Sequence, residues 1–337
     1  MGGNAVKNFG NVIRLNTHEF DELALDIVAT LSSENVHIYP IPSYHSKEDH
    51  GDMDLLTTSD FWKHNSRLSV NKKLNSVGHV QNGTVTSYAI PYGKDVFQVD
   101  IIHVPEDKFD FAYNYFSWND AGNLLGRIAH FTGFKLGHLG LQYILRDPDN
   151  SDHVVSELTV TNDWDVALEF LCYDPTKYRK GFNDLSDVFE YIITNKFAHR
   201  DIFLLENRNN VSRTRDRKRK TYMEFLKWLE TNDSQKQGQD KVAVREEMLS
   251  EALGFFPKFS SAYHSAMDLF RKKQRVNKIV NGNVVSEMTG YSGEELGAFL
   301  STFKEAYSID ELYALSDDEI YKKLSDFHDE WKETSGY

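Results

Sequence analysis

The stretch Ser43-Tyr44-His45-Ser46-Lys47-Glu48-Asp49-His50-Gly51-Asp52-Met53-Asp54-Leu55-Leu56 decides how this chain is interpreted. Two carboxylates, Asp52 and Asp54, stand two residues apart, after a polar loop and at the mouth of an apolar run. In a strand, residues i and i+2 point to the same face, so the two carboxylates are predicted to project together while Met53 faces the core. The stretch therefore predicts a strand that opens on a paired acidic site.

A third acidic residue, Asp100, lies inside the apolar run Val99-Asp100-Ile101-Ile102. An unpaired carboxylate in such a run is costly, which favours a functional role. Three converging carboxylates suit Mg²⁺, which takes oxygen ligands at roughly 2.1 Å and shares them with substrate phosphates. Two such ions about 3.5–4 Å apart serve phosphoryl transfer, and Mn²⁺ can substitute. We therefore predict that Asp52, Asp54 and Asp100 are catalytic residues and ligands of two Mg²⁺ ions.

The polar loop before the paired carboxylates carries groups that bind phosphate. Ser43 offers a hydroxyl and Lys47 an ammonium group, and both are predicted to bind the triphosphate of a nucleotide. The sequence has no Gly-x-x-x-x-Gly-Lys-Ser/Thr loop, which disfavours a P-loop kinase or ATPase. The motifs therefore predict a nucleotidyltransferase whose substrate is a nucleoside triphosphate.

The composition is that of an ordinary globular protein. Of the 337 residues, 40% are apolar and 26% are charged, which is enough for two domains. The sequence has no run of about 18 apolar residues, so we expect no membrane span. It has no apolar signal core at the N-terminus, so we do not expect secretion. The single cysteine, Cys172, fits a reducing cytoplasm or nucleoplasm. The formal net charge of −13 argues against indiscriminate nucleic-acid binding but leaves room for a local basic face.

Hydrophobic periodicity predicts an α+β fold, a mixed β-sheet with flanking helices, followed by an all-α region. Asn16, with Glu19 three residues on, is expected to cap a helix that runs to residue 31. Strands are predicted over 36–40, 52–57, 84–90, 96–104 and 154–160. Later helices are predicted over 119–130, 164–171, 185–195, 214–230, 242–254, 260–277, 293–307 and 316–332. We therefore expect a catalytic domain over 1–180 and a helical, nucleic-acid-binding domain over 181–337.

The acidic strands resemble those of a known enzyme superfamily. Gly51-Asp52-Met53-Asp54-Leu55-Leu56-Thr57 is very similar to the metal-binding strand of the polymerase β-like nucleotidyltransferases, and looks closest to DNA polymerase family X. Val99-Asp100-Ile101 resembles the third-carboxylate strand of that family. Ser43 stands where the family has the serine of its Gly-Ser phosphate loop, and Pro42 replaces the glycine. The resemblance spans roughly residues 36–180 and implies a nucleotidyltransferase palm.

A second match lies downstream, in Tyr115-Phe116-Ser117-Trp118-Asn119-Asp120, which resembles the family's Tyr-Phe-Thr-Gly-Ser-Asp segment. The resemblance implies that Tyr115 and Phe116 pack against the sugar of the incoming nucleotide. It also implies that Asn123 contacts the incoming base and that Arg127 contacts the template strand. Trp118 replaces the family's glycine at the turn that discriminates between deoxyribose and ribose.

The C-terminal region resembles a different branch of the superfamily. Ile279-Val280-Asn281-Gly282-Asn283-Val284-Val285 and Gly290-Tyr291-Ser292-Gly293-Glu294-Glu295-Leu296-Gly297 look like the helical tail of CCA-adding enzymes and bacterial poly(A) polymerases. Those enzymes act on RNA 3′ ends. Glycines also serve as turn and cap residues in any helical domain, so both interpretations stay open.

Two short segments concentrate basic residues on an otherwise acidic chain. One contains Arg208, Arg213, Arg215, Arg217, Lys218, Arg219 and Lys220, with Asp216 as its only acid, and the other contains Arg271, Lys272, Lys273, Arg275 and Lys278. Such concentration is typical of phosphate-backbone binding, although charge runs also form solvated helix faces. We expect a nucleic-acid backbone to be held by Arg213, Arg215, Arg217, Lys218, Arg219, Lys220, Lys272 and Lys273.

The leading hypothesis is a Mg²⁺-dependent enzyme that adds a nucleoside monophosphate to a DNA or RNA 3′-hydroxyl and releases pyrophosphate. The family X match favours DNA synthesis, whereas the tail favours RNA 3′-end tailing. A further alternative is nucleotidylation of a protein acceptor, and a non-catalytic binding module that retains the fold is the least favoured.

Overall fold

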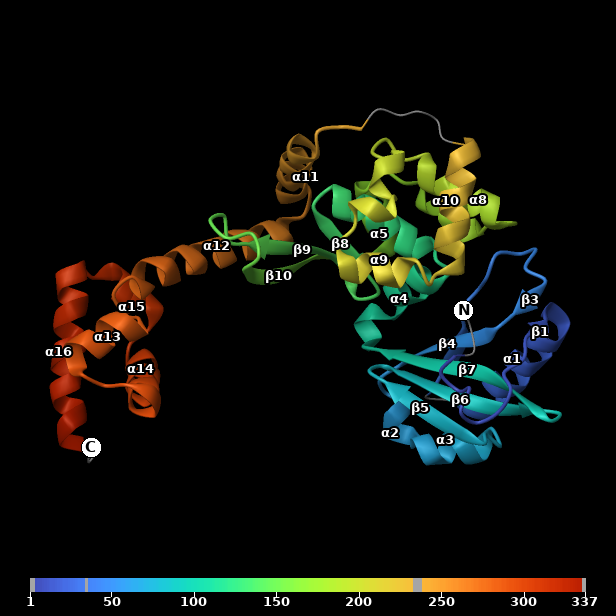
Figure 1. The fold of residues 1–337 in the computed structure, drawn as a ribbon, viewed down its shortest axis with the longest axis horizontal. Helices are drawn as coiled ribbons and strands as arrows, with labels where there is room; N and C mark the ends of the chain where they lie inside the picture. Colours follow the sequence, from blue (N-terminus) through green and yellow to red (C-terminus); the bar gives the residue numbers. More distant parts are fainter. Residues whose placement is uncertain (1–3, 34–35, 233–237, 335–337) are drawn as a thin grey trace. The chain divides into compact units, whose positions relative to one another are not determined.

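The computed structural model describes residues 4–33, 36–232 and 238–334 (Figure 1). The chain divides into two compact units, one made of residues 1–144 and 157–259 and the other of residues 145–156 and 260–337. The main division therefore falls at residue 260, whereas the sequence analysis placed it at residue 181. The coarse order is as expected, because a mixed sheet with flanking helices precedes a long helical region.

A mixed five-stranded sheet forms the base of the first unit, in the order β2-β4-β7-β6-β5. The central strands, β4 and β7, are parallel, and the other neighbours are antiparallel. The bounds are β2 Ile38–Pro40, β4 Asp52–Thr58, β5 Gly78–Asn82, β6 Val85–Tyr92 and β7 Asp95–Val104. A separate two-stranded pair joins β1 (Leu15–Asn16) to β3 (Asp49–His50). The predicted strands 52–57, 84–90 and 96–104 are confirmed.

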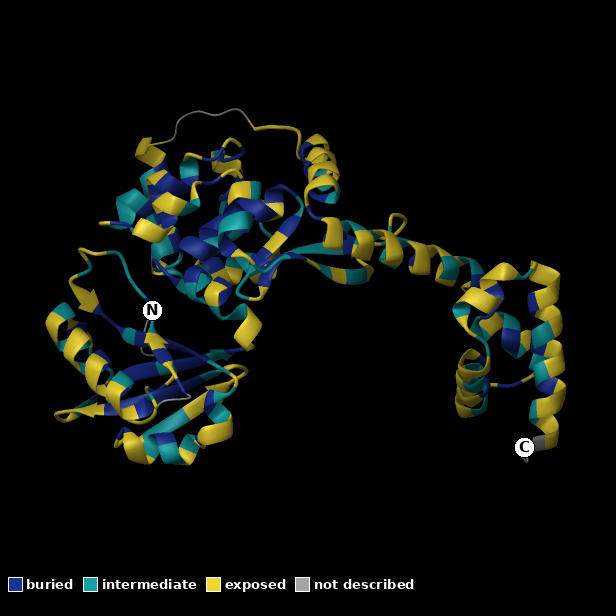
Figure 2. Cartoon of the chain, turned by 180° about the vertical axis from the view of Figure 1, so that it is seen from behind, coloured by how far each residue is buried: buried dark blue, intermediate teal, exposed yellow. Residues whose placement is uncertain are grey.

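Helices cover one face of this sheet. They are α1 (Thr17–Leu31), α2 (Phe61–His64) and α3 (Arg67–Lys73). Asn16 and Glu19 form the predicted capping box of α1, each side chain bonding to the backbone of the other residue. The core of this layer includes apolar residues of α1 together with Met53 and Leu55 of β4 and Phe97, Val99 and Ile101 of β7. In Figure 2 the central strands of the sheet are largely dark, whereas the outer faces of the helices are exposed.

A largely helical layer follows the sheet within the first unit. Its helices are α4 (Phe109–Phe116), α5 (Ala121–Phe131), α6 (Trp164–Phe170), α7 (Pro175–Lys180), α8 (Leu185–Ile193), α9 (Asn210–Asp216), α10 (Lys220–Asn232) and α11 (Lys241–Phe255), with 3₁₀ turns at Glu106–Lys108, Arg200–Ile202 and Leu205–Asn207. The single helix predicted over 214–230 is instead two helices, α9 and α10, which meet at residues 217–219. A three-stranded sheet, in the order β10-β9-β8, contains β8 (Phe134–Gly137), β9 (Gly140–Arg146) and β10 (Val154–Thr161).

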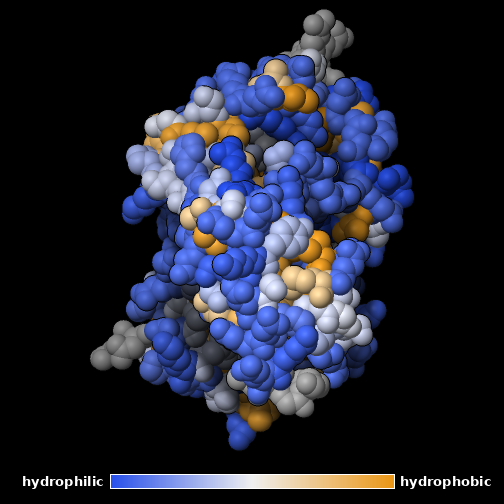
Figure 3. All heavy atoms as spheres, turned by 90° about the vertical axis from the view of Figure 1, so that its left-hand side faces the viewer, coloured by the Kyte–Doolittle hydropathy of each residue, from blue (hydrophilic) through white to orange (hydrophobic). Residues whose placement is uncertain are grey.

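The second unit is mainly helical and has its own apolar core. Its helices are the greater part of α12 (Pro257–Asn277), then α13 (Gly282–Thr289), α14 (Gly293–Ala306), α15 (Ile309–Ala314) and α16 (Asp317–Thr334). Phe299 and Phe303 of α14 and Leu324 of α16 are fully buried in that core. Among the residues that the structure describes, no helix is both long and apolar enough to cross a membrane. The face of the molecule shown in Figure 3 is mostly hydrophilic, with scattered apolar areas.

Candidate active site

The register of β4 and β7 places the predicted carboxylates side by side. Asp54 lies opposite Asp100 in the parallel pair, and Asp52 lies opposite Gln98. Neighbouring strands are about 4.8 Å apart, so this register brings the backbones of Asp54 and Asp100 within that range. Both strands place alternate residues in the core shared with α1, so the three carboxylates share the other face. The structure therefore brings together the residues that two distant segments of sequence predicted.

The negative charge of this group of carboxylates is only partly compensated, because Lys47 is the main cation acting on Asp52 and Asp54. The side chain of Asp54 is exposed at the strand, but the protein mass around it raises its pKa well above the usual range, and repulsion from Asp52 and Asp100 adds to the effect. Burial raises the pKa of Asp100 to about 6, although hydrogen bonds from Ser87 and Gln98 oppose the shift. A carboxylate cluster of this kind is stabilised either by protons or by cations.

A divalent cation fits the donor set of this cluster. Asp52, Asp54 and Asp100 supply only oxygen donors, which Mg²⁺ prefers, and the mutual repulsion at Asp54 is the charge that such an ion would neutralise. In the described parts of the chain, no three acidic, histidine or cysteine side chains already surround one point as a finished metal-binding group. Asp100 is instead held by Gln98, whose amide nitrogen donates to both carboxylate oxygens, at 3.0 and 2.9 Å.

The loop over residues 41–48 places the two predicted phosphate-binding side chains next to each other. The ammonium group of Lys47 donates to the hydroxyl of Ser43 at 3.1 Å. Burial lowers the pKa of Lys47, while attraction to Asp52 and Asp54 opposes that shift. Backbone hydrogen bonds fix the loop, because His45 and Ser46 donate to carbonyls of residues 182 and 183 at 2.9 and 2.8 Å. The ammonium group of Lys47 is thus held beside the carboxylates of Asp52 and Asp54 on a fixed loop.

A cavity of about 970 Å³ opens in front of these groups. Its lining residues include Ser43, Lys47, Asp52 and Asp54, whereas Asp100, the strand neighbour of Asp54, does not line it. The remaining wall comes largely from α9, α10 and the residues between them, and its basic side chains are those of Arg215, Lys218, Arg219 and Lys220. A basic segment that is about 160 residues from the paired carboxylates in the sequence therefore lines the same cavity. That volume lies within the range of about 300–1,000 Å³ that is typical of ligand sites.

The aromatic segment between α4 and α5 borders this cavity. Phe116 lines it, whereas Tyr115 packs behind, with its ring 5.4 Å from that of Phe116. Trp118 and Asn119 both have a φ of +61°, in the left-handed region that glycine adopts most easily. The turn therefore keeps a glycine-like backbone where the resembling family has glycine, and the buried Trp118 ring packs against Phe182 at 5.9 Å.

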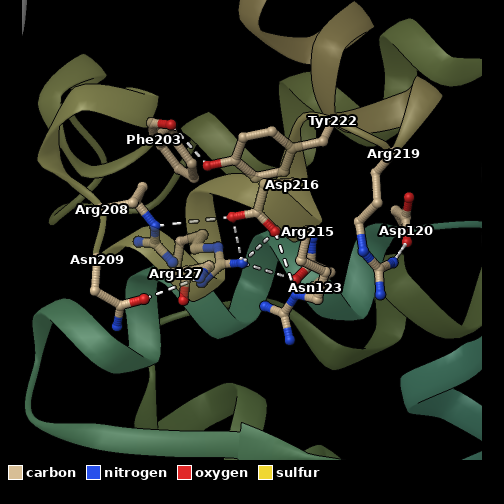
Figure 4. Close-up of polar contacts among 11 residues, drawn as sticks. Asp120, Asn123, Arg127, Phe203, Arg208, Asn209, Arg215, Asp216, Arg219 and Tyr222 are labelled. Atoms are coloured by element: carbon tan, nitrogen blue, oxygen red, sulfur yellow. Dashed lines mark hydrogen bonds and ion pairs between the residues drawn. The ribbon is translucent and has the colours of Figure 1, made fainter.

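Arg127 is buried inside the helical layer, so it is not exposed for the template contact that the resemblance implied. Its guanidinium donates to both oxygens of the fully buried Asp216, at 2.9 and 2.8 Å (Figure 4). The same nitrogen donates to Asn123 at 3.1 Å, so Asn123 also faces this internal pair. Neither Arg127 nor Asn123 lines the large cavity. In this structure Arg127 fixes α5 to the end of α9, and Asn123 accepts a bond from Arg127 within α5.

The remaining basic residues divide into free and engaged groups. Arg217, Lys218 and Lys220 are exposed, although Lys220 lies 3.7 Å from Glu224. Arg213 donates to the backbone of residue 208. In the second unit, Lys272 is held by Asp268 and Asp310, each at 2.6 Å, whereas Lys273 is exposed. The two carboxylates that hold Lys272 make it a poor candidate for a free phosphate contact.

Several residues of the site carried no role in the sequence analysis. Gln98 orients Asp100, and its only signal was its place two residues before Asp100 on the same strand face. Asp120 pairs with Arg219 at the wall of the large cavity, and Asp216 anchors Arg127. Those two pairings join residues 99 and 89 positions apart, and no local pattern predicts them.

Comparison with known proteins adds no family to this description. No protein-family model matches the chain, and no curated protein matches it either.

Proposed function

We propose that this protein is a divalent-metal-dependent nucleotidyltransferase that adds a nucleoside monophosphate to the 3′-hydroxyl of a nucleic acid. The observation that carries the proposal is the parallel register of Asp54 and Asp100, with Asp52 on the same face, beside Lys47 and Ser43. This arrangement combines oxygen ligands for cations with donors for phosphate at one cavity, as phosphoryl transfer requires. The resemblance to the polymerase β-like palm points the same way.

Each group has a task that follows from its chemistry. Asp52 and Asp54, which line the cavity, would hold Mg²⁺ together with the triphosphate, and Asp100 would complete the ligand set. The bound ions would lower the pKa of the attacking hydroxyl and stabilise the charge of the leaving pyrophosphate. Lys47 and Ser43 would donate to phosphate oxygens, and the carboxylate of Asp100 would accept the proton of the hydroxyl.

The basic wall of the large cavity indicates which molecule accepts the nucleoside monophosphate. Lys218 is exposed on that wall, and Arg215, Arg219 and Lys220 accompany it. A nucleic-acid backbone presents repeated phosphates to such a surface, whereas a small acceptor does not need it. This favours a nucleic-acid end over a protein acceptor, and the family X resemblance makes DNA our first choice.

The resemblance of the C-terminal region to RNA-tailing enzymes has a simpler structural explanation. Gly290 is the left-handed C-cap of α13, with a φ of +80°, and Gly293, with a φ of +56°, begins α14. Both glycines are therefore accounted for as residues at helix ends. RNA tailing is retained as an outcome of the experiment below.

A matrix of acceptors and nucleotides tests the proposal. Purified protein with Mg²⁺ would be offered labelled dNTPs or NTPs together with a DNA primer, an RNA primer or a protein mixture, with and without template. We expect label on a nucleic-acid 3′ end and release of pyrophosphate. Untemplated label on RNA alone would select tailing, and label on protein would select the alternative acceptor. If no acceptor is labelled with either metal, Mg²⁺ or Mn²⁺, the proposed function fails.

A further inference from the structure

A second, smaller cavity lies in the helical layer, apart from the candidate active site. It has a volume of about 200 Å³, and its wall includes Arg127, His130, His199, Arg208 and Lys241. These residues come from α5, from the irregular segment before α9 and from the first turn of α11. Among its lining residues, Asp201 carries the only carboxylate. Two arginines and a lysine thus meet a single acid at this wall.

The positive charge around this cavity is only partly balanced by the protein. Asp216 is shared by three guanidinium groups, because Arg127 bonds to it while Arg208 and Arg215 lie 3.8 and 3.5 Å away (Figure 4). Burial lowers the pKa of Lys241, and repulsion from Arg245 and Arg208 lowers it further. Cations that repel one another at the rim of a cavity are the arrangement that a bound anion stabilises.

Arg208 supplies an independent observation that points to a ligand. Its side chain is only 8% exposed, and its Nε lies 3.8 Å from the Asp216 carboxylate, which is too far for a hydrogen bond. Within the described residues its guanidinium therefore donates no hydrogen bond, although it is buried. The Nε of Arg127, whose side chain is also 8% exposed, is likewise unpartnered. A buried charged donor that lacks an acceptor is costly, and a planar guanidinium is well suited to an oxyanion. The cavity therefore lacks an acceptor rather than a donor.

We propose that this cavity binds a phosphoryl oxyanion, held chiefly by Arg208 and Lys241. Its volume of about 200 Å³ lies below the range of about 300–1,000 Å³ for drug-sized ligands, which favours a single phosphate or pyrophosphate group over a whole nucleotide. That chemistry has two sources, a free ion or one phosphate of a nucleic-acid backbone. The site is independent of the proposed nucleotidyl transfer, because its residues do not line the large cavity.

Isothermal titration with pyrophosphate in excess chelator tests the site. The wild-type protein is expected to bind pyrophosphate at the small cavity, because without metal ions the carboxylates of Asp52, Asp54 and Asp100 repel an anion from the large one. Lys241→Ala should weaken this binding roughly 3- to 10-fold and Arg208→Gln roughly 10- to 100-fold, the range expected for charged hydrogen bonds. Lys94→Ala, in an exposed turn, is the matched control and should leave the binding unchanged.

The variants differ in their risk to folding. Arg208 is buried near Asp216, so circular dichroism must show that Arg208→Gln folds, whereas Lys241 is exposed and can be removed safely. The proposal is overturned if folded Lys241→Ala and Arg208→Gln both bind pyrophosphate as Lys94→Ala does.

A second titration identifies the source of the phosphate. It uses a single-stranded oligonucleotide of about 12 residues, within the usual range of site sizes for such ligands. If Lys241→Ala binds both pyrophosphate and the oligonucleotide more weakly than wild type does, the natural ligand is a backbone phosphate. If it binds only pyrophosphate more weakly, the natural ligand is a free ion. Both outcomes support the site, and each can be read whether or not the protein transfers nucleotides.

Discussion

The backbone N–H of Trp118 donates a hydrogen bond of 2.9 Å to the carbonyl oxygen of Pro42. This bond joins the loop over residues 41–48 to the turn between α4 and α5, so the two segments that resemble a nucleotide site are fixed to each other. In this position Trp118 adopts a φ of +61°, a conformation that costs a non-glycine residue about 1–2 kcal/mol. Burial of its ring against His45 and Phe182 offsets that strain.

The packing around Trp118 predicts that Gly181 cannot be replaced. A Cβ on Gly181 would lie 2.4 Å from the Trp118 ring, at a φ of +82°. Gly83, with a φ of +58° and nothing within 4 Å of its Cβ position, is the control for a positive φ without crowding. We expect Gly181→Ala to cost about 1–3 kcal/mol more than Gly83→Ala, because of the overpacking. Urea denaturation of both variants measures this, and equal midpoints would contradict the packing described here.

The raised pKa of Asp100 predicts how the stability of the metal-free protein depends on pH. Burial raises that pKa from 3.8 to about 6, so the folded protein binds the proton more tightly than the unfolded chain. Ionisation of Asp100 therefore opposes folding, and its destabilising effect develops as pH rises from 3.8 through about 6. Asp100→Asn should thus melt increasingly higher than wild type from pH 5 to pH 7.5, by roughly 2–4 °C for each kcal/mol.

The measurement is a melting series in chelator. Asp95→Asn, at the half-buried start of the same strand, serves as control, because its carboxylate bonds only to Asn11 among the described residues. Parallel pH curves for Asp100→Asn and wild type would show that Asp100 ionises normally.

The buried pair of Arg127 and Asp216 is expected to be important for stability. Removing one partner leaves an uncompensated buried charge, so Asp216→Ala should lower the free energy of unfolding by about 3–5 kcal/mol. The exposed pair of Arg14 and Asp49 is the control, since exposed pairs contribute about 0–1 kcal/mol. Urea denaturation compares Asp216→Ala with Asp49→Ala. If the two variants lose similar free energies of unfolding, the charge of Asp216 does not stabilise the three arginines around it, Arg127, Arg208 and Arg215.

The basic wall of the large cavity makes a prediction about salt. If Lys218 contacts a phosphate of the nucleic acid, Lys218→Ala should reduce the slope of log affinity against log salt by roughly 0.7–0.9. Affinity itself should fall to a similar degree for all sequences, because phosphate contacts carry no base information. Fluorescence anisotropy with a labelled single strand at several salt concentrations gives the slope. An unchanged slope, equal to that of Lys94→Ala, would remove Lys218 from the acceptor site.

The elements that the sequence predicted well are those with strong local patterns. The capping box at Asn16, the alternation around Asp52 and the apolar run around Asp100 are each written within a few residues. α4 was not predicted, because Phe109–Phe116 is aromatic on several sides and lacks a clear polar face. The division between units was misplaced because it falls inside the helix α12, with no linker composition to mark it.

The candidate site likewise contains residues that a local sequence pattern predicts and residues whose role depends on distant parts of the chain. The carboxylates and the phosphate loop follow from motif and strand geometry, whereas the internal role of Arg127 depends on Asp216, which lies 89 residues away. The charge run over 208–220 predicted a basic surface but not which members are engaged inside the protein. Only the folded chain shows that Lys218 faces the cavity of Asp52 while Arg208 lines another.

The most direct test of the central claim is nucleotidyl transfer by Asp100→Asn, measured as label incorporated per minute into the acceptor found for the wild-type protein. Removing the proposed proton acceptor and cation ligand at this position should lower the rate about 10²- to 10⁴-fold, while the protein stays folded and Asp95→Asn keeps the wild-type rate. Transfer by Asp100→Asn at the wild-type rate would contradict the account, because catalysis would then not require the carboxylate that the sheet places opposite Asp54.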